Sequence, residues 1–158
     1  MPAKGGTPRQ LTVLDPARHE LVHTDAAVFP GTRTVLFTSL TTEPGAEQIE
    51  AVPLDGGRRS VVIEHAMAPV WSPTGHLLFG RDGAVSAAPF DPGSAKVRGA
   101  AVPVIRAGVV GTNHFGNPGF QLSSTGTLLF TPVGFADKRI VSVARDGSEL
   151  ALNLPPNG

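Results

Sequence analysis

A glutamate flanked by two histidines is the strongest catalytic motif in this sequence. The tract from His19 to His23, with Glu20 in second place, matches the pattern His-Glu-x-x-His. On a helix the two imidazoles would share one face and bind zinc, and the glutamate would activate a water. Asp15 and Pro16 could begin such a helix as its N-cap and first residue. A third zinc ligand would have to come from one of three later glutamates, Glu43, Glu47 or Glu50.

The residues around this motif limit the zinc-hydrolase hypothesis. A β-prone run begins soon after Thr24 and Asp25, which leaves room for roughly two helical turns. The chain has no tyrosine to stabilise an oxyanion, and the three candidate glutamates fall in an expected loop and strand. We therefore keep zinc-dependent hydrolysis, with His19 and His23 as metal ligands, as the alternative to a non-catalytic function that needs no cofactor.

Other patterns of catalysis and of charged-partner recognition are missing from the sequence. The chain contains no cysteine, which excludes disulfides, thiolate zinc sites and cysteine nucleophiles. It has no Gly-x-Ser-x-Gly nucleophile elbow, and the glycines at 108 and 111 lack the spacing and context of a dinucleotide-binding loop. Lys+Arg and Asp+Glu number 13 each, so the charge balance gives no reason to expect nucleic acid or an anionic membrane as partner.

No segment of the sequence predicts membrane insertion. The first residues carry no apolar stretch after Lys4 and do not resemble a signal peptide. The longest apolar tract, residues 100–111, contains Arg106 and is too short to span a bilayer. We expect a soluble chain, and these features leave its compartment open.

A repeated pattern predicts the elements that position the motifs. Residues 29–37, 71–79 and 122–130 align without a gap. Each copy has a large apolar residue, a turn of small and polar residues, and an apolar triplet that ends in phenylalanine, which is typical of a β-hairpin. We expect the first and last residues of the three copies to lie in a core between packed sheets: Phe29, Trp71, Leu122, Phe37, Phe79 and Phe130.

A second signature follows each hairpin. A β-prone run ends in aspartate and then glycine or proline, at Asp55, Asp91 and Asp146, where the aspartate side chain would cap a turn. Another apolar run comes next, so each unit holds four short strands in about 42 to 51 residues, as in a propeller blade. We predict an all-β fold, a partial β-propeller of about three four-stranded antiparallel blades, at residues 24–65, 66–108 and 109–156, with an extra outer strand of a preceding blade at 5–15.

The sequence resembles the repeat of TolB-like β-propellers in Trp71-Ser-Pro-Thr-Gly, in Leu77-Leu-Phe79 and in Gly5-Gly-Thr-Pro-Arg-Gln-Leu-Thr12. It is also similar, in Glu20-Leu-Val-His23 and the hairpins that follow, to the propeller attached to many bacterial receptor-type serine/threonine kinases. This resemblance implies a non-catalytic sensing, ligand-binding or protein-interaction module of a larger protein, on the extracytoplasmic (periplasmic) side. It implies no kinase activity, because the phosphate-binding and catalytic kinase motifs are missing from the sequence.

The sequence departs from this repeat at three positions in two of the blades. The first hairpin has Arg33 where the other two have Gly75 and Gly126. The last blade has Ala144 and Arg145 in place of a Pro-Phe pair.

Polar residues in the connections that enter each inner strand are the candidate binding residues. In propellers these connections open toward the central channel, where a protein or small-molecule ligand would bind. The segment 111–118 is the most polar and irregular of them. The connections carry the following candidates: His23, Asp25, Met67, Asn113, His114 and Asn117.

Three blades cannot close a ring, so an arc of three leaves an apolar face at each end. The chain is then a fragment of a longer propeller, which we favour, or one of two copies in a homodimer that closes a six-bladed ring. In the second case the strand expected near residues 7–12 could pair with an edge strand of the other copy.

Overall fold

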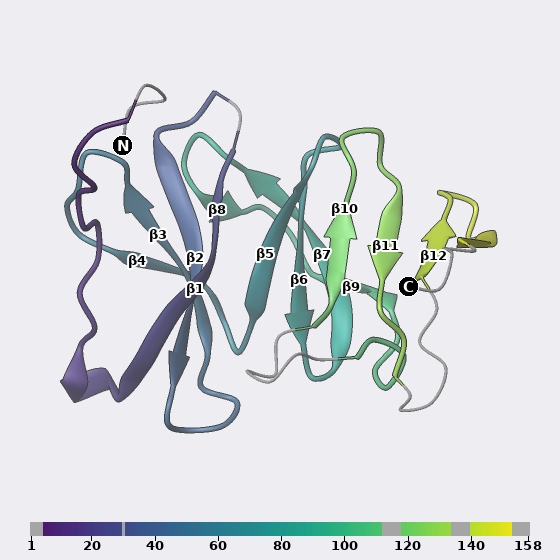
Figure 1. Ribbon diagram of the computed structural model, residues 1–158, viewed down its shortest axis with the longest axis horizontal. Helices are drawn as coiled ribbons and strands as arrows, with labels where there is room; N and C mark the ends of the chain where they lie inside the picture. Colours follow the sequence, from purple (N-terminus) through teal and green to yellow (C-terminus); the bar gives the residue numbers. More distant parts are fainter. Residues whose placement is uncertain (1–4, 30, 112–117, 134–139, 153–158) are drawn as a thin grey trace.

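Three antiparallel sheets stand in a row in the computed structural model, which describes residues 5–29, 31–111, 118–133 and 140–152 (Figure 1). The sheet of blade 1 runs in the order β1–β2–β3–β4: Glu20–Val28, Thr34–Thr41, Gln48–Pro53 and Ser60–Glu64. In blade 2, β8 and β9 both pair with β7, and β5 to β9 are Met67–Ser72, His76–Arg81, Ala84–Asp91, Lys96–Val97 and Val102–Ile105. Blade 3 contains β10 to β13: Phe120–Leu122, Leu128–Phe130, Ile140–Val143 and Glu149–Leu152.

This architecture confirms the predicted partial propeller of three antiparallel blades, in which blades 1 and 3 have four strands and blade 2 has a fifth because both β8 and β9 pair with β7. The strands of blade 1 begin at Glu20, earlier than the expected residue 24, because β1 includes part of the His-Glu-x-x-His tract. A three-residue 3-10 turn, Pro16–Arg18 (η1), precedes β1. Within the described ranges, no helix is long and apolar enough to cross a membrane.

Tight turns join the first two strands of each blade, as the repeat predicts. In blades 2 and 3, Gly75 and Gly126 adopt positive φ angles of 81° and 91°, a backbone region that glycine enters without steric cost. In blade 1 the left-handed residue is Gly31, with φ 76°. Arg33 therefore does not have to adopt a positive φ angle. Its guanidinium binds both carboxylate oxygens of Asp55, at 2.5 and 3.1 Å.

The aspartates that end the third strands cap turns in two of the three blades. The carboxylate of Asp91 accepts hydrogen bonds from the Ser94 hydroxyl at 2.8 Å and from the guanidinium of Arg98. Hydrogen bonds from Arg98 and Ser94 lower the pKa of Asp91 to about 2. Asp146 accepts from the backbone N–H of Ser148 at 2.9 Å. Asp55 pairs with Arg33 across the sheet instead, so the turn-capping prediction is confirmed only for Asp91 and Asp146.

Alternate residues of each strand face the two neighbours of its blade. We call the face toward the N-terminal end of the arc the upstream face and the opposite one the downstream face. Leu36 and Leu78 lie on downstream faces and are buried. The buried residues between blades 1 and 2 include Phe29, Leu36, Ile49, Leu77, Phe79 and Phe90, and those between blades 2 and 3 include Leu78, Val85, Val110, Phe120, Phe130 and Val141.

Five of the six predicted core residues lie between blades. Phe29 packs on the half-buried Trp71 with a ring-centroid distance of 5.5 Å, and Phe79 is buried in the same cluster. Phe130 and the half-buried Leu122 belong to the second interface. Phe37 is the exception, because it lies on the upstream face of blade 1, against which no other blade of the described residues packs. Phe37 is nevertheless buried, in a cluster with Val35, Val52 and Leu11.

The predicted outer strand at residues 5–15 is not formed. The segment has no strand pairing within the described chain. It lies instead along the outside of blade 1, away from the other two blades (Figure 1). Leu11 packs on the upstream face, and the guanidinium of Arg9 donates to the backbone oxygens of Leu54 and, at 2.8 Å, Asp55.

Candidate functional site

The His-Glu-x-x-His tract begins as the zinc-site hypothesis expects but does not continue as a helix. The side chain of Asp15 caps η1 by accepting from the backbone N–H of Ala17 at 2.9 Å, and Pro16 is the first residue of the turn. His19 then adopts the left-handed conformation with φ 54°, which ends the helical turn. Glu20 starts β1, so the two histidines do not share a helix face.

A β-bulge brings Glu20 and His23 to the same side of blade 1. In a regular strand, residues three apart point to opposite faces. The pairing of β1 with β2 shifts between Glu20 and Val22, and such a bulge reverses the alternation. As a result, Nε2 of His23 lies 3.1 Å from Oε2 of Glu20. His19 stays exposed to solvent at the end of η1.

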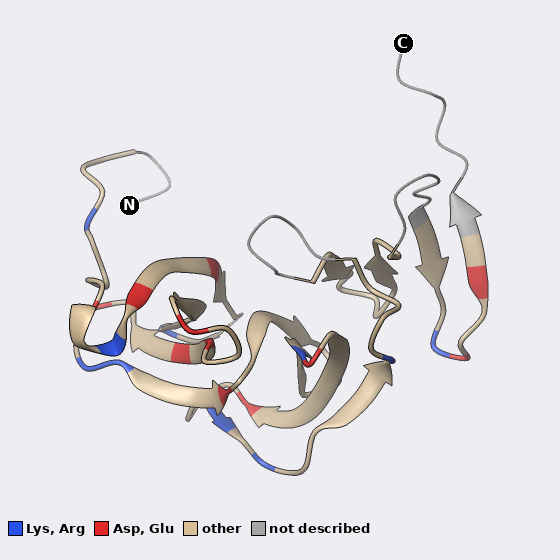
Figure 2. Cartoon of the chain, turned by 90° about the horizontal axis from the view of Figure 1, so that it is seen from below, with Lys and Arg blue, Asp and Glu red and all other residues tan. Residues whose placement is uncertain are grey.

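Glu20 and His23 belong to a buried ion network on the upstream face of blade 1, together with Glu50, Arg18 and Arg59. The side chains of both glutamates have no exposed surface. Nη2 of Arg18 lies 2.5 Å from Oε1 of Glu50, and Nη1 of Arg59 lies 3.1 Å from Oε2 of Glu20. Figure 2 shows that acidic and basic residues come close together near the N-terminal end of the chain. The negative charges of the two carboxylates are thus balanced by two guanidinium groups.

The electrostatics of the network keep Glu20 ionised. Burial raises the pKa of Glu20, but hydrogen bonds from the Asp15 backbone N–H, from Arg59 and from His23 outweigh this effect and hold the pKa below its usual value. The hydrogen bond to Glu50 raises the pKa of Arg18. A carboxylate that accepts from cations and has a lowered pKa is a weak base. Glu20 is therefore poorly suited to activate a water.

His23 is held from both sides of its ring. Its Nδ1 lies 2.8 Å from Oγ1 of Thr12, and its Nε2 lies 2.9 Å from Nη1 of Arg59. The ring also packs on Phe37, with centroids 4.8 Å apart. Among the described residues, no group of three or more His, Cys, Asp and Glu side chains converges on a common point. The tract considered as an alternative zinc site thus joins the N-terminal segment to blade 1.

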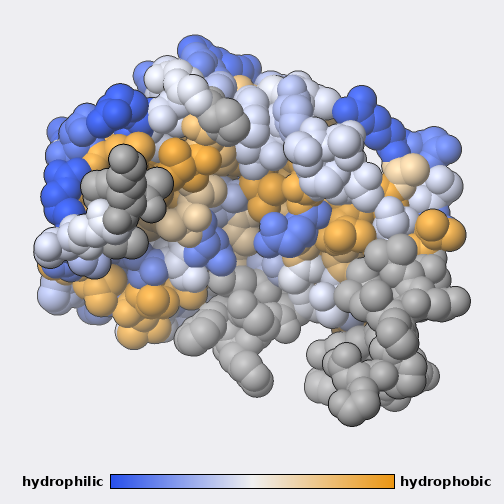
Figure 3. Space-filling model, turned by 45° about the horizontal axis from the view of Figure 1, so that its top comes forward, coloured by the Kyte–Doolittle hydropathy of each residue, from blue (hydrophilic) through white to orange (hydrophobic). Residues whose placement is uncertain are grey.

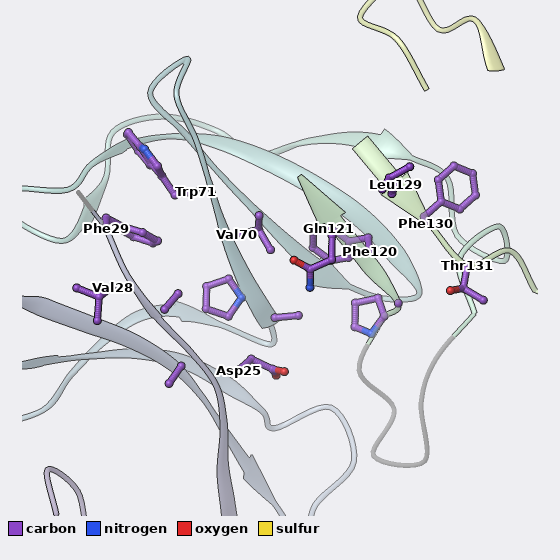
Figure 4. Close-up of a pocket in the computed structure, with 16 residues that line it drawn as sticks. Asp25, Val28, Phe29, Val70, Trp71, Phe120, Gln121, Leu129, Phe130 and Thr131 are labelled. Carbon is purple, nitrogen blue, oxygen red and sulfur yellow. The ribbon is translucent and has the colours of Figure 1, made fainter. Parts of the chain in front are cut away.

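A groove of about 700 Å³ lies where the first strands of the three blades approach one another (Figure 4). We call it the central groove. Figure 4 shows the side chains of Asp25, Val70 and Gln121 around the space that separates β1, β5 and β10. Its volume is typical of ligand-binding pockets. The lining residues come from all three blades and are mostly apolar: Asp25, Ala26, Ala27, Val28, Phe29, Ala68, Pro69, Val70, Trp71, Pro118, Gly119, Phe120, Gln121, Leu129, Phe130 and Thr131.

Bulges shape the walls of the central groove at equivalent places in blades 1 and 2. The pairing of β1 with β2 shifts between Thr24 and Ala27, and that of β5 with β6 shifts between Met67 and Val70. Within these bulges, Asp25 and Ala68 have positive φ angles of 52° and 54°. Left-handed backbone at a residue other than glycine is strained, and such strain is concentrated at functional sites. The bulges bend both inner strands where they border the groove.

The predicted binding residues lie in different parts of the molecule. Asp25 lines the central groove. His23 does not, because the bulge at Glu20 turns its ring toward the ion network. Met67 borders a smaller pocket, of about 270 Å³, between the ends of blades 1 and 2. Asn113, His114 and Asn117 lie outside the described residues.

Most groove residues were missed by reasoning from loop polarity, because the groove is built from strands. The signal that could have found them is the spacing of the repeat, since Phe29 and Trp71 begin equivalent hairpins and both line the groove. Val28, Val70 and Gln121 each directly precede those hairpin residues in the aligned copies. The three equivalent positions thus lie side by side around one space.

No protein-family model matches this chain, and no curated protein matches it. Solved structures do. A calcium-binding protein, regucalcin, from Agrobacterium tumefaciens aligns with a TM-score of 0.62 and 16% identity over 82% of this chain and 44% of its own. A luciferin-regenerating enzyme gives a TM-score of 0.61 and 14% identity, over 83% of this chain and 45% of its own. A nidogen/laminin complex gives 0.54 and 13%, over 81% of this chain and 45% of that chain.

The matched proteins are β-propellers. The present chain spans less than half the length of each. At such low identity the likeness concerns the fold alone. The chain therefore has the fold of a partial β-propeller, with its central groove on the side where the first strands of the blades converge.

Proposed function

We propose that this chain is a non-catalytic binding module of a larger β-propeller protein and that its central groove binds an apolar part of a protein ligand. The observation that carries the proposal is the groove itself, because three blades contribute to one space lined mainly by apolar side chains. Exposed apolar surface of this kind costs free energy in water, and it marks interaction sites. Figure 3 shows apolar residues in patches across the middle of one face of the molecule.

The edges of the groove favour an extended polypeptide over a compact small molecule. β1, β5 and β10 are edge strands of their sheets, and edge strands offer backbone groups to an added chain. The half-buried Trp71 supplies aromatic surface, which is enriched at binding hot spots. A peptide with one bulky apolar side chain fits this combination.

The cellular setting is part of the same proposal. The resemblance of the hairpins to receptor-kinase propellers supports a sensor role, with the module attached to a bacterial serine/threonine kinase and placed on the extracytoplasmic side. The charge balance of the chain supports a protein or peptide ligand over nucleic acid. The alternative function, zinc-dependent hydrolysis by His19, Glu20 and His23, requires the helix that His19 ends.

A matched pair of variants tests the groove. Val28 lines it and is 53% exposed, whereas Val61 on β4 is 45% exposed and does not line it. The probe is a set of random twelve-residue peptides displayed on phage and selected on the full chain. Binding of a selected synthetic peptide is followed by the fluorescence of Trp71, the only tryptophan of the chain.

We expect Val28→Asp to weaken binding of the selected peptide by about tenfold, as for a hot-spot change, and Val61→Asp to leave it unchanged. Both variants change an exposed side chain, so both are expected to keep the far-ultraviolet circular dichroism of the parent. Peptides that bind equally well to both variants, or that leave the emission of Trp71 unaltered, would contradict the proposal. One zinc ion per chain, lost in a His19→Ala variant, would favour the hydrolase alternative.

A further inference from the structure

We propose that the central groove selects extended peptide segments in which a bulky apolar side chain lies a few positions from a lysine or arginine, and that the carboxylate of Asp25 receives the cation. The inference rests on the proposed function, because it names the chemistry of the ligand that the groove binds. It concerns only the space where β1, β5 and β10 approach one another.

The groove has a single sign of charge. Asp25 is the one charged residue among the described residues that line it. The other lining side chains are apolar or aromatic, apart from the neutral Gln121 and Thr131. Apolar surroundings lower the local dielectric and strengthen electrostatic interactions. A ligand cation that enters the groove therefore meets a negative charge, and charge complementarity of this kind adds specificity to an interface.

The backbone of the bulge does not by itself require a carboxylate. Asp25 lies in the bulge of β1 with φ 52°, and Ala68 lies in the equivalent bulge of β5 with φ 54°. A residue without a polar side chain thus forms the same left-handed conformation in this chain. Blade 3 contributes Gly119 to the groove, just before β10. The charge is therefore a property of blade 1 that the repeated fold does not explain.

The carboxylate of Asp25 is placed to meet a ligand. Asp25 is half-buried, and Figure 4 shows its side chain and that of Gln121 extending into the same space. Asp25 also interacts within the chain, but a carboxylate has two oxygens and about four acceptor sites. It can therefore accept from an ammonium or guanidinium group as well, and such charge-assisted hydrogen bonds are stronger than neutral ones.

The apolar part of the groove lies farther along the inner strands. Val28 and the half-buried Trp71 line the groove near the C-terminal ends of β1 and β5. From Asp25 to Val28 the chain advances by three residues, which is about 10 Å along a regular strand. An extended ligand rises by about 3.3 Å per residue. Its apolar residue and its cation are therefore expected roughly two to four positions apart.

Two variants with the same change in net charge test the role of Asp25. Asp25→Asn removes the carboxylate in the groove, and Asp82→Asn removes one that does not line it. Asp82 is the matched control because its backbone is also left-handed, with φ 51°, and asparagine tolerates this conformation as aspartate does. The probe is the phage library of random peptides selected on the full parent chain, followed by synthetic copies of the selected peptides.

The ligand side is tested with the protein unchanged. In each synthetic peptide, lysine is replaced by norleucine, or arginine by citrulline, which keeps most of the side chain and removes its charge. This measurement answers the question if Asp25→Asn does not fold. Binding is followed by the fluorescence of Trp71 at low and at high salt, because salt screens a charge pair.

We expect the peptides that bind in the groove, defined by weaker binding to Val28→Asp, to be enriched in lysine or arginine near a bulky apolar residue. Asp25→Asn should weaken their binding by about tenfold, between the effects of exposed and of buried charge pairs, and Asp82→Asn should leave it unchanged. The neutral peptide should lose a similar factor on the parent chain, and its affinity should be the same for Asp25→Asn and should not depend on salt.

Groove-binding peptides that have no excess of lysine or arginine and bind Asp25→Asn as tightly as the parent would overturn this inference and leave the proposed function in place. Equal losses in Asp25→Asn and Asp82→Asn would also overturn it, because the effect would then arise from net charge. Selected peptides that bind Val28→Asp as well as the parent would contradict the proposed function, and this inference with it.

Discussion

Replacement of Gly80 by alanine tests the packing of blade 2 on blade 3. Gly80 lies on β6, at the position equivalent to Thr38 in blade 1. A Cβ atom at Gly80 would lie 2.9 Å from Cδ of Pro118 and closer still to its Cγ, and 3.4 Å from Cγ of Met67. Pro118 is a ring and cannot rotate away. Relief must therefore come from a shift of the chain that leads into blade 3.

Two opposite effects determine how much Gly80→Ala changes the free energy of unfolding. Overpacking of a well-packed interior costs about 1–3 kcal/mol. Gly80 is not among the glycines with positive φ, so alanine fits the backbone there and removes the roughly 0.5–1 kcal/mol by which glycine weakens a strand. The net expectation is a loss of about 1–2 kcal/mol in the free energy of unfolding.

Urea denaturation followed by the fluorescence of Trp71 measures this loss, since Trp71 lies in blade 2. The double-mutant cycle with Pro118→Ala isolates the contact, because removal of the ring should make Gly80→Ala neutral or stabilising. We expect a coupling free energy of about 1–3 kcal/mol, the overpacking cost alone, within the range for residues in direct contact. Gly93→Ala, in an exposed turn where the new Cβ meets only the Asp91 carboxylate, is the matched control.

A Gly80→Ala chain that retains Pro118 and is as stable as the parent, or more stable, would contradict this packing. Such a result would mean that β6 and the chain entering blade 3 do not approach each other as described. A loss of the same size in the Pro118→Ala background would locate the cost in β6 itself.

Two further stability changes are expected. Leu78→Ala, in the core between blades 2 and 3, should lower the free energy of unfolding by about 2–5 kcal/mol in urea denaturation. Leu129 is the equivalent residue on the half-buried downstream face of blade 3, and Leu129→Ala should cost at least about 1 kcal/mol less because it leaves a smaller cavity. Equal losses would argue against an open downstream face. Because the pKa of Glu20 is held below its usual value of 4.5, the folded chain binds fewer protons than the unfolded chain, so its contribution to stability is present above pH 4.5 and is lost as the pH falls toward the lowered pKa. Urea midpoints at pH 7, 5 and 3.5 should show this loss in the parent and a shallower one in Glu20→Gln, and parallel curves would contradict it.

Local features of the sequence account for the fold. Hydrophobic alternation and turn residues such as Gly75 and Gly126 act over a few neighbours, so the hairpins and the three blades could be predicted without the tertiary structure. The same is true of Asp91 and Asp146, whose side chains bond to residues two or three positions away. Repetition strengthened these predictions, because each blade carries the same pattern.

The candidate site was only partly predictable. Asp25 was expected near the channel and lines the central groove. Trp71 was expected in the core, and Gln121 was not singled out. Neither was expected in a groove, because a groove between blades depends on how the sheets pack against one another. Loop polarity does not contain that information, and the spacing of the repeat contains it only once the sheets are placed.

The sequence by itself determined three four-stranded blades, because strand and turn preferences are set by residues close together in the chain. The tertiary structure decided the role of the N-terminal segment and of the His-Glu-x-x-His tract. Arg18 and Glu50 are 32 positions apart, and a β-bulge turns His23 toward Glu20. A buried charge must find its partner wherever the fold places it, so these side chains form an ion network, whereas the motif alone offered a zinc site as the alternative.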